Sequence, residues 1–137
     1  MHDQALANEL KSADNVCSKV YYASRTHSQL KQVVKELRQT AYRPRMSVLG
    51  SREHYCLHKD VSRSSTKNDD CKKLLENNAC SYATQMRRLQ EHPALRVPAG
   101  ELAVWDVEDL VSLGRRTNGC PYLVRSCIYI VLPVKIT

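Results

Sequence analysis

The pattern of apolar and polar positions in the first fifty residues predicts a strand, a helix and a second strand. Residues 20–23, VYYA, combine β-branched and aromatic side chains, as is typical of a short buried strand. Thr26 and Gln29 then have the spacing of a capping box, and the apolar positions that follow recur at helical intervals: Leu30, Val33, Val34 and Leu37. Residues 46–49, MSVL, predict a second strand that ends at Gly50. This order predicts a βαβ unit, whose two strands are parallel and joined by a right-handed crossover.

The rest of the chain has a less regular pattern that is mostly helical. Residues 61–70 are polar and predict a loop, within which Asn68 or Asp69 is placed to begin a helix. A further helix is expected over residues 81–92. Residues 93–104 contain two prolines and a glycine, so they are expected to form a linker.

The last predicted helix begins at Asp106, and Asp109 follows three residues later at its first turn. Gly114 is expected to end this helix, and residues 115–119 are expected to form a turn. The pattern as a whole therefore predicts an α/β chain, with a partial βαβ unit followed by a mostly helical region.

Length and composition are those of about one globular domain. The chain has 137 residues, of which 42% are hydrophobic and 26% are charged, so wholesale disorder is not expected. It has one Trp and no Phe, so aliphatic side chains and some kind of cross-link must carry the packing. The net charge is +7, and the first fifty residues carry 8 basic against 4 acidic side chains, which favours a polyanionic partner such as nucleic acid.

Neither a membrane-spanning helix nor a secretory leader is expected from the sequence. The chain contains no apolar window of about 18 residues, and its first residues, MHDQ, are polar. The six cysteines are therefore expected in a reducing compartment, where metal binding or simple burial is the usual role of a thiol.

Four cysteines in the irregular region are candidate metal ligands, with 14, 8 and 39 residues between them: Cys56, Cys71, Cys80 and Cys120. Four thiolates complete either a tetrahedral zinc site or an iron-sulfur cluster. Structural zinc usually has a pair of ligands two to four residues apart, which these cysteines lack, so the wide spacing suits a larger cluster. Two alternatives stay open: unrelated buried thiols, and a zinc site in which His54 or His58 replaces one cysteine. Cys17 and Cys127 are expected to be inert.

The carboxyl ends of the two predicted strands carry candidate anion-binding residues. Ligands of parallel sheets gather at these ends, and here residues 24–27, SRTH, and residues 50–52, GSR, each supply an arginine beside hydroxyl groups. Nucleotide-binding motifs are lacking. Residues 114–119 fit the start of a phosphate loop, but Cys120-Pro121 stands where its lysine and hydroxyl residue belong.

Several strings together resemble the superfamily 2 iron-sulfur DNA helicases. Residues 19–30, KVYYASRTHSQL, resemble helicase motif Ia, and residues 49–60, LGSREHYCLHKD, resemble the entry to the cluster domain of that family. The later cysteines, the string WDVEDLVSLG and the string Cys-Pro-Tyr follow in the same order. The resemblance covers residues 19 to about 125.

This resemblance implies a function and a set of site residues. In the family, motif Ia belongs to a RecA-like domain and touches the DNA backbone, and an inserted domain holds a 4Fe-4S cluster beside the path of the DNA. The enzymes move 5′ to 3′ on single strands and act in telomere maintenance and DNA repair, which implies a nuclear protein. Carried over to this chain, the cluster ligands would be Cys56, Cys71, Cys80 and Cys120. The residues facing DNA would be Arg25, Thr26, His27 and Arg52.

The resemblance also implies a division of the chain and a limit on its activity. Residues 1–50 would be part of the RecA-like ATP-binding domain, residues 51–125 the iron-sulfur domain, and residues 126–137 a divergent tail. The Walker A and DEAH motifs of the family are not found in this sequence, so ATP and Mg²⁺ would be cofactors of the full-length helicase only. A truncated product that binds DNA, as a single strand or a fork, is expected; a zinc-bound interaction module and an unstable fragment are the alternatives.

Overall fold

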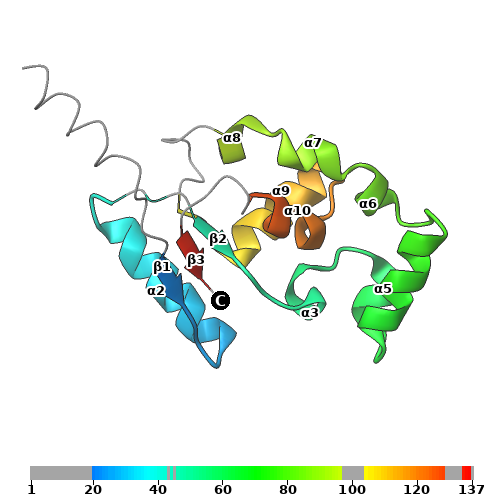
Figure 1. Ribbon diagram of the computed structural model, residues 1–137, viewed down its shortest axis with the longest axis horizontal. Coiled ribbons are helices and arrows are strands. Elements are labelled where there is room, and N and C mark those ends of the chain that lie inside the picture. Colours follow the sequence, from blue (N-terminus) through cyan, green and yellow to red (C-terminus); the bar gives the residue numbers. More distant parts are fainter. Residues whose placement is uncertain (1–19, 43, 45, 97–103, 129–133, 137) are drawn as a thin grey trace, which may run out of the picture.

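The computed structural model describes residues 20–42, 44, 46–96, 104–128 and 134–136. The described part is elongated, with a small sheet and the helix α2 (His27–Gln39) at one end and the helix α5 (Lys67–Glu76) at the other (Figure 1). The remaining helices lie between these ends. Among the described residues, no helix has the length and apolar character needed to span a membrane.

The sheet has three parallel strands: β1 (Val20–Tyr22), β2 (Met46–Val48) and β3 (Val134–Ile136). Their order is β1-β3-β2, so the strand that is last in the sequence lies in the middle. Val134 is in register with both Val20 and Met46. The predicted parallel direction is confirmed, but β1 and β2 are not direct neighbours. The assignment of this sheet to a RecA-like domain stays a prediction.

The expectation that the first strand is buried is wrong for the described chain. Val20, Tyr21 and Tyr22 are 58%, 60% and 41% exposed, whereas all three residues of β2 are buried. β1 is an edge strand with one hydrogen-bonded neighbour, while β2 packs against the helix α10 (Pro121–Ile128). The composition of a segment indicates whether its side chains suit a β-sheet. Whether the strand is buried depends in addition on another layer of the fold that covers it.

Helix α2 forms for the reasons that the sequence indicates. Thr26 is its N-cap and accepts a hydrogen bond from the backbone N–H of Gln29 at 3.4 Å. Leu30 and Val34, one turn apart, are buried, and the neighbouring apolar positions of the same face are half-buried. The apolar face of α2 therefore points toward the core, as its spacing predicts.

Short helices follow β2 in close succession: α3 (Arg52–Tyr55), α4 (Lys59–Arg63), α5 (Lys67–Glu76), α6 (Ser81–Thr84), α7 (Met86–Gln90), α8 (Pro93–Arg96), α9 (Val107–Thr117) and α10 (Pro121–Ile128). The loop expected at residues 61–70 is largely wrong, because α4 occupies its beginning and α5 starts at Lys67 after its N-cap Thr66. The expected linker at residues 93–104 begins instead with α8, and residues 97–103 of it lie outside the described residues.

Helix α9 begins as predicted but ends later. The Asp106 side chain accepts from the N–H of Asp109, and the Asp109 side chain accepts from the N–H of Asp106, both at 2.9 Å. Gly114 does not stop the helix, which continues to Thr117 and ends at Asn118 in the left-handed conformation. The glycine is needed for packing instead, because a Cβ atom there would lie 2.5 Å from the ring of Pro121.

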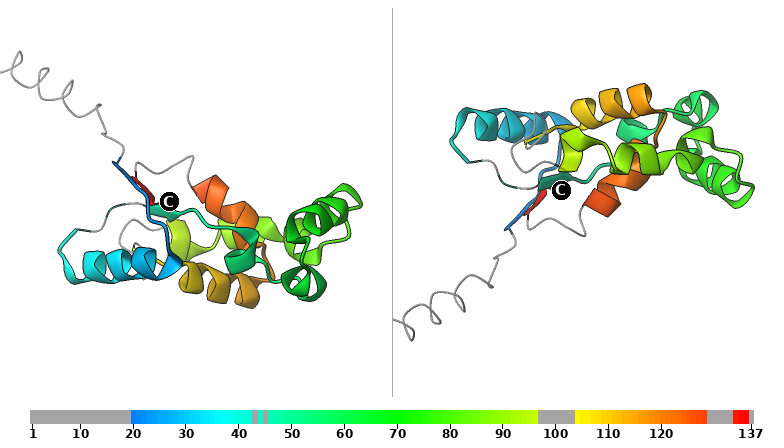
Figure 2. Two further views of the ribbon diagram at one scale, coloured as in Figure 1. Left: turned by 90° about the horizontal axis from the view of Figure 1, so that it is seen from below. Right: turned by 90° about the horizontal axis from the view of Figure 1, so that it is seen from above.

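The core joins segments that are far apart in the sequence. Its largest fully buried side chains are Trp105, Tyr55, Met46, Leu89, Leu110 and Leu113. Tyr55 donates a hydrogen bond from its hydroxyl to the carbonyl of Val48 at 2.6 Å. The two further views show α10 beside α7 and β2 (Figure 2), and these elements are in contact. Residues on both sides of the predicted boundary at residue 50 therefore share one core.

Candidate metal centre

The four candidate ligands lie at the ends or on the face of four different helices. Cys56 is the C-cap of α3, and Cys71 lies within α5. Cys80 is the N-cap of α6, and Cys120 directly precedes α10. The backbone N–H of Cys120 also bonds to the carbonyl of Tyr82 at 2.9 Å, which ties the segment before α10 to α6.

These four cysteines line one small cavity at the end of the molecule that carries α5. Its walls combine the thiols with six apolar side chains and four polar ones: Cys56, Cys71, Cys80, Cys120, Leu57, Val61, Leu74, Leu75, Ala83, Leu123, Arg52, His58, Tyr82 and Tyr122. Cys80 is buried and the other three are half-buried. The structure therefore brings together the four cysteines that were selected from the sequence. Cys127 is not part of this lining, and Cys17 lies outside the described residues.

Burial makes two of the thiols weaker acids. It raises the pKa of Cys56 above its ordinary value and raises the pKa of Cys120 to about 11. Backbone N–H groups oppose this effect, from His58 toward Cys56 and from Leu123 and Tyr122 toward Cys120. Both thiols are therefore protonated at neutral pH without a metal, and the same N–H groups are available to stabilise the thiolates that a metal would require.

The arrangement is a poor match for one zinc ion. Across the part of the chain described, no three His, Cys, Asp or Glu side chains are close enough to bind a single metal ion. With Zn–S bonds of about 2.3 Å, tetrahedral coordination requires its sulfur atoms to be within about 4 Å of one another. A cluster of several irons spreads its thiolates more widely. His58 lines the cavity and His54 does not, so only His58 is placed for the Cys3His alternative.

Two unpaired polar atoms distinguish the cavity from an ordinary apolar core. In the described chain, the side-chain nitrogen and oxygen atoms that are buried without a hydrogen-bond partner are Arg52 Nε and His58 Nδ1, and both residues line the cavity. Such groups normally have a partner. Four thiols, the Arg52 Nε–H group and the His58 imidazole form a set that fits an iron-sulfur cluster. The free volume is only about 20 Å³, so the walls must move apart to admit one.

Two side chains hold Arg52 in place. Its guanidinium lies over the ring of Tyr122, 4.2 Å from the centroid, and it donates to the side chain of Asn68 at 2.9 Å. Arg125 also lies over the Tyr122 ring, at 3.6 Å. Each pairing is a cation–π contact. Tyr122 thus links the segment before the first cysteine to the helix after the last one.

The residues expected to face DNA follow β1 and β2, as the strand-end argument predicts. Arg25 is exposed and lines a shallow surface pocket of about 400 Å³ before α2. Thr26 is the exposed N-cap of α2. His27 is partly buried, and its ring stacks on that of His54 with centroids 4.4 Å apart. Since His54 is two residues after Arg52, this contact brings the two strand ends together.

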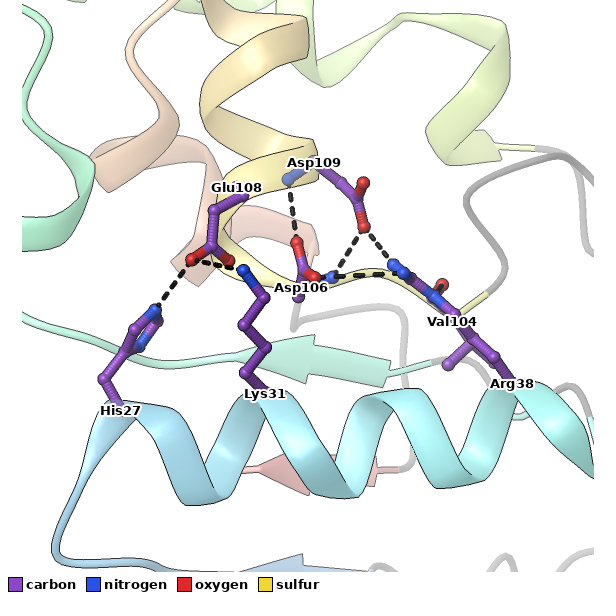
Figure 3. A network of polar contacts seen from close by, with 7 residues as sticks. All are labelled: His27, Lys31, Arg38, Val104, Asp106, Glu108 and Asp109. Carbon is purple, nitrogen blue, oxygen red and sulfur yellow. Dashed lines mark hydrogen bonds and ion pairs between the residues drawn. The ribbon is translucent and has the colours of Figure 1, made fainter.

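A polar network joins α2 to the start of α9 (Figure 3). Glu108 accepts from Lys31 at 3.2 Å and contacts the His27 ring nitrogen at 3.3 Å. Arg38 donates to the carbonyl of Val104 at 3.0 Å and also bonds the Asp109 carboxylate. The network fixes α2 against α9, the helix that leads to Cys120.

Two acids of this network, Asp106 and Glu108, have pKa values that are shifted in opposite directions. Burial raises the pKa of Asp106, and the nearby carboxylates of Asp109 and Glu108 raise it further. Partial burial also acts to raise the pKa of Glu108, but hydrogen bonds from its own backbone, His27 and Lys31 outweigh this and hold it below the ordinary value. Glu108 is therefore a carboxylate whose charge the fold stabilises.

Several of these residues were not identified from the sequence. Asp109 was expected only to mark the first turn of a helix, which the capping box confirms, and no partner was derived for Glu108. Their contacts with α2 were missed. The available signal in the sequence was charge complementarity. The polar face of α2 carries the basic residues Lys31 and Arg38, and the first turn of α9 carries the acidic residues Glu108 and Asp109.

Comparisons with known proteins identify related sequences. The family model DEAD_2 matches residues 22–131. The regulator of telomere elongation helicase 1 homolog of Oryza sativa subsp. japonica is 43% identical over 111 residues, which cover 77% of this chain and 10% of that protein. The homolog from Drosophila melanogaster is 44% identical over 108 residues, 76% of this chain and 11% of that protein.

A relative with a different name is similar over a comparable length. The Fanconi anemia group J protein homolog of Gallus gallus is 41% identical over 109 residues, 76% of this chain and 9% of that protein. The chain thus spans about a tenth of the length of the curated relatives that it matches. The expected resemblance to this helicase group is confirmed, and the chain belongs to the DEAD_2 family.

Proposed function

We propose that this chain is the cluster-binding and motif Ia segment of an ATP-dependent 5′ to 3′ DNA helicase that acts in telomere maintenance or DNA repair. Cys56, Cys71, Cys80 and Cys120 would hold a 4Fe-4S cluster. The family match and the relatives named as regulators of telomere elongation helicase support the role of the whole protein. A nuclear location follows from that role, since telomeres and chromosomal DNA lie in the nucleus.

The observation that carries the cluster proposal is the convergence of four cysteines on one cavity. They lie at or on four helices and are separated by 14, 8 and 39 residues. Unrelated thiols that are buried by chance are not expected to line the same cavity. The unpaired Nε–H group of Arg52 and the unpaired Nδ1 atom of His58 also support the proposal, because cluster sulfur atoms would accept hydrogen bonds from Nε–H and from a protonated Nδ1.

The role of the cluster in this chain would be mechanical. When bound, the group supplies four strong bonds to one rigid core, which restrict the unfolded chain as cross-links do. Residues of the protein would then hold the cluster in position. Apolar side chains of α4, α5 and α10 exclude water from the cavity, and Tyr122 stacks on Arg52 beside it.

Anaerobic reconstitution of the full chain with iron and sulfide tests this proposal. We expect about four irons and four sulfides per chain and a visible absorbance band that bleaches in air. Replacing any one of the four cavity cysteines by serine should lower the iron content. Cys127→Ser is the matched control, because Cys127 is half-buried on α10 but does not line the cavity. A colourless protein with one zinc per chain would contradict the proposal and favour the structural zinc module.

The proposed DNA contacts run through Arg25, Thr26, His27 and Arg52 at the ends of β1 and β2. The Arg25 guanidinium is on an exposed residue, whereas the His27 ring is half-buried and contacts Glu108 and His54. Backbone amides at the start of α2, which has 13 residues, add partial positive charge at the same place. We therefore assign the largest electrostatic contribution to Arg25.

Salt dependence of binding to a single strand and to a forked duplex tests these contacts. Each phosphate neutralised contributes a slope of about −0.7 to the plot of log affinity against log salt for single strands. Arg25→Gln should reduce the magnitude of the negative slope by about 0.7. Lys35→Gln, on the exposed side of α2, is the control and should change it less. Affinity that does not depend on salt would contradict phosphate binding. This chain contains no Walker A or DEAH motif, so we expect no ATP hydrolysis from it alone.

A further inference from the structure

His58 occupies a distinctive place in the cysteine cavity. It is two residues after Cys56, it lines the cavity, and its backbone N–H is directed at the Cys56 sulfur. Its side chain is 21% exposed, yet its Nδ1 atom is buried without a hydrogen-bond partner. Of the histidines in the described chain, His58 is the one that lines this cavity.

A buried imidazole nitrogen is stabilised by a hydrogen bond, which it donates when it carries a proton and accepts when it does not. The nearest carboxylate oxygen, on Asp60, is 4.0 Å from Nδ1, which is too long for a hydrogen bond. Asp60 is also 94% exposed, so water competes for its oxygens. The polar residues that line the cavity with His58 are the four cysteines, Arg52, Tyr82 and Tyr122, and none of them bonds Nδ1 in the described structure. The four cysteines bring sulfur atoms, which accept hydrogen bonds but hardly donate them.

We propose that His58 donates a hydrogen bond from its imidazole N–H to a sulfur atom at the cysteine site, and that this bond sets the reduction potential of the cluster. The inference rests on the proposed cluster. His58 would be a positioning residue, because iron is held by the four cysteines. Hydrogen bonds to cluster sulfurs stabilise the more negative, reduced state, and so they raise the potential.

Three variants of the reconstituted full chain separate this role from structural effects. His58→Leu removes the N–H group, and we expect its midpoint potential to become more negative and its cluster to bleach faster in air. His58→Asn keeps an amide nitrogen close to the Nδ1 position, so it should restore much of the wild-type potential. Asp60→Asn alters the nearest other acceptor and should leave the potential nearly unchanged.

A measurement on the wild-type chain keeps the proposal testable if the His58 variants assemble poorly. In protein labelled with ¹⁵N-histidine, pulsed electron paramagnetic resonance of the reduced cluster should detect a weak nitrogen coupling, transmitted through the hydrogen bond. Absence of this coupling would overturn the inference.

The outcomes also distinguish this inference from the proposed function. A wild-type chain that takes up zinc and no iron would contradict the cluster itself. A wild-type chain with an intact cluster, and a His58→Leu variant with the same potential and the same lifetime in air, would overturn the role of His58 alone.

Discussion

Substitution of Gly114 by alanine probes the packing that positions the last cysteine. An ideal Cβ atom at this residue would lie 2.5 Å from Cγ of Pro121 and 2.9 Å from the carbonyl oxygen of Gly119. Carbon atoms in good contact are about 3.5–4.0 Å apart, so the methyl group is roughly 1 Å too close to the proline ring. Both obstacles flank Cys120, and neither a ring nor a backbone carbonyl can rotate away.

The magnitude follows from two opposing effects. Overpacking lowers the free energy of unfolding by about 1–3 kcal/mol, whereas replacing glycine by alanine inside a helix raises it by about 1 kcal/mol. Because the obstacles are rigid, we expect Gly114→Ala to lower the free energy of unfolding by about 1–2 kcal/mol. With an m-value of about 2 kcal/mol/M, the urea midpoint should fall by roughly 0.5–1 M.

Urea unfolding followed by circular dichroism measures this change, and iron retention reports the displacement of Cys120. Ser112→Ala, on the exposed side of the same helix, is the control and should shift stability by no more than about 0.5 kcal/mol. If Gly114→Ala were as stable as the parent chain and retained its iron equally well, close packing of α9 against Pro121 would be refuted.

Three further predictions concern polar contacts within the fold. Arg38→Ala should lower the free energy of unfolding by about 1–2 kcal/mol, because the mostly buried carboxylate of Asp106 loses its nearby cation, whereas Lys35→Ala should have little effect in the same urea titration. The depressed pKa of Glu108 means that its charge adds stability above the ordinary pKa of glutamate, about 4.3, and that this is lost as the pH falls through the lower folded-state value. Glu108→Gln should therefore flatten the acid limb of a plot of melting temperature against pH; an unchanged limb would contradict the assignment. Tyr55→Phe removes a buried hydrogen bond to a β2 carbonyl and should cost about 1–3 kcal/mol, measured by thermal unfolding, and a neutral effect would argue against that bond.

The elements that the sequence predicted well are those with local causes. Helix α2 follows from the spacing of Leu30 and Val34 and from the cap at Thr26, all within nine residues. The start of α9 follows from the Asp106 and Asp109 pair. Periodicity and capping are properties of a short segment, so they can be read without knowledge of the remaining fold.

The errors arose where distant segments decide the structure. Gly114 has the sequence signature of a helix stop, but its lack of a side chain accommodates Pro121, which is a tertiary contact. The exposure of β1 depends on which layers cover it. The four cysteines could be selected from their number and spacing, but their shared cavity could not be derived from spacing alone, because four helices must first be placed. The contact of Glu108 with Lys31 on α2 was missed for the same reason, because it depends on where two distant helices are placed.

The strand order has a consequence for how the chain matures on the ribosome. β1 and β2 make no ladder with each other, and the segment that bridges them is translated after both. The sheet therefore closes late, after the helices between residues 52 and 128 have been made. Until β3 is made, the edges of β1 and β2 that it will cover have no partner strand. Unpaired strand edges promote aggregation between nascent chains, which chaperones prevent.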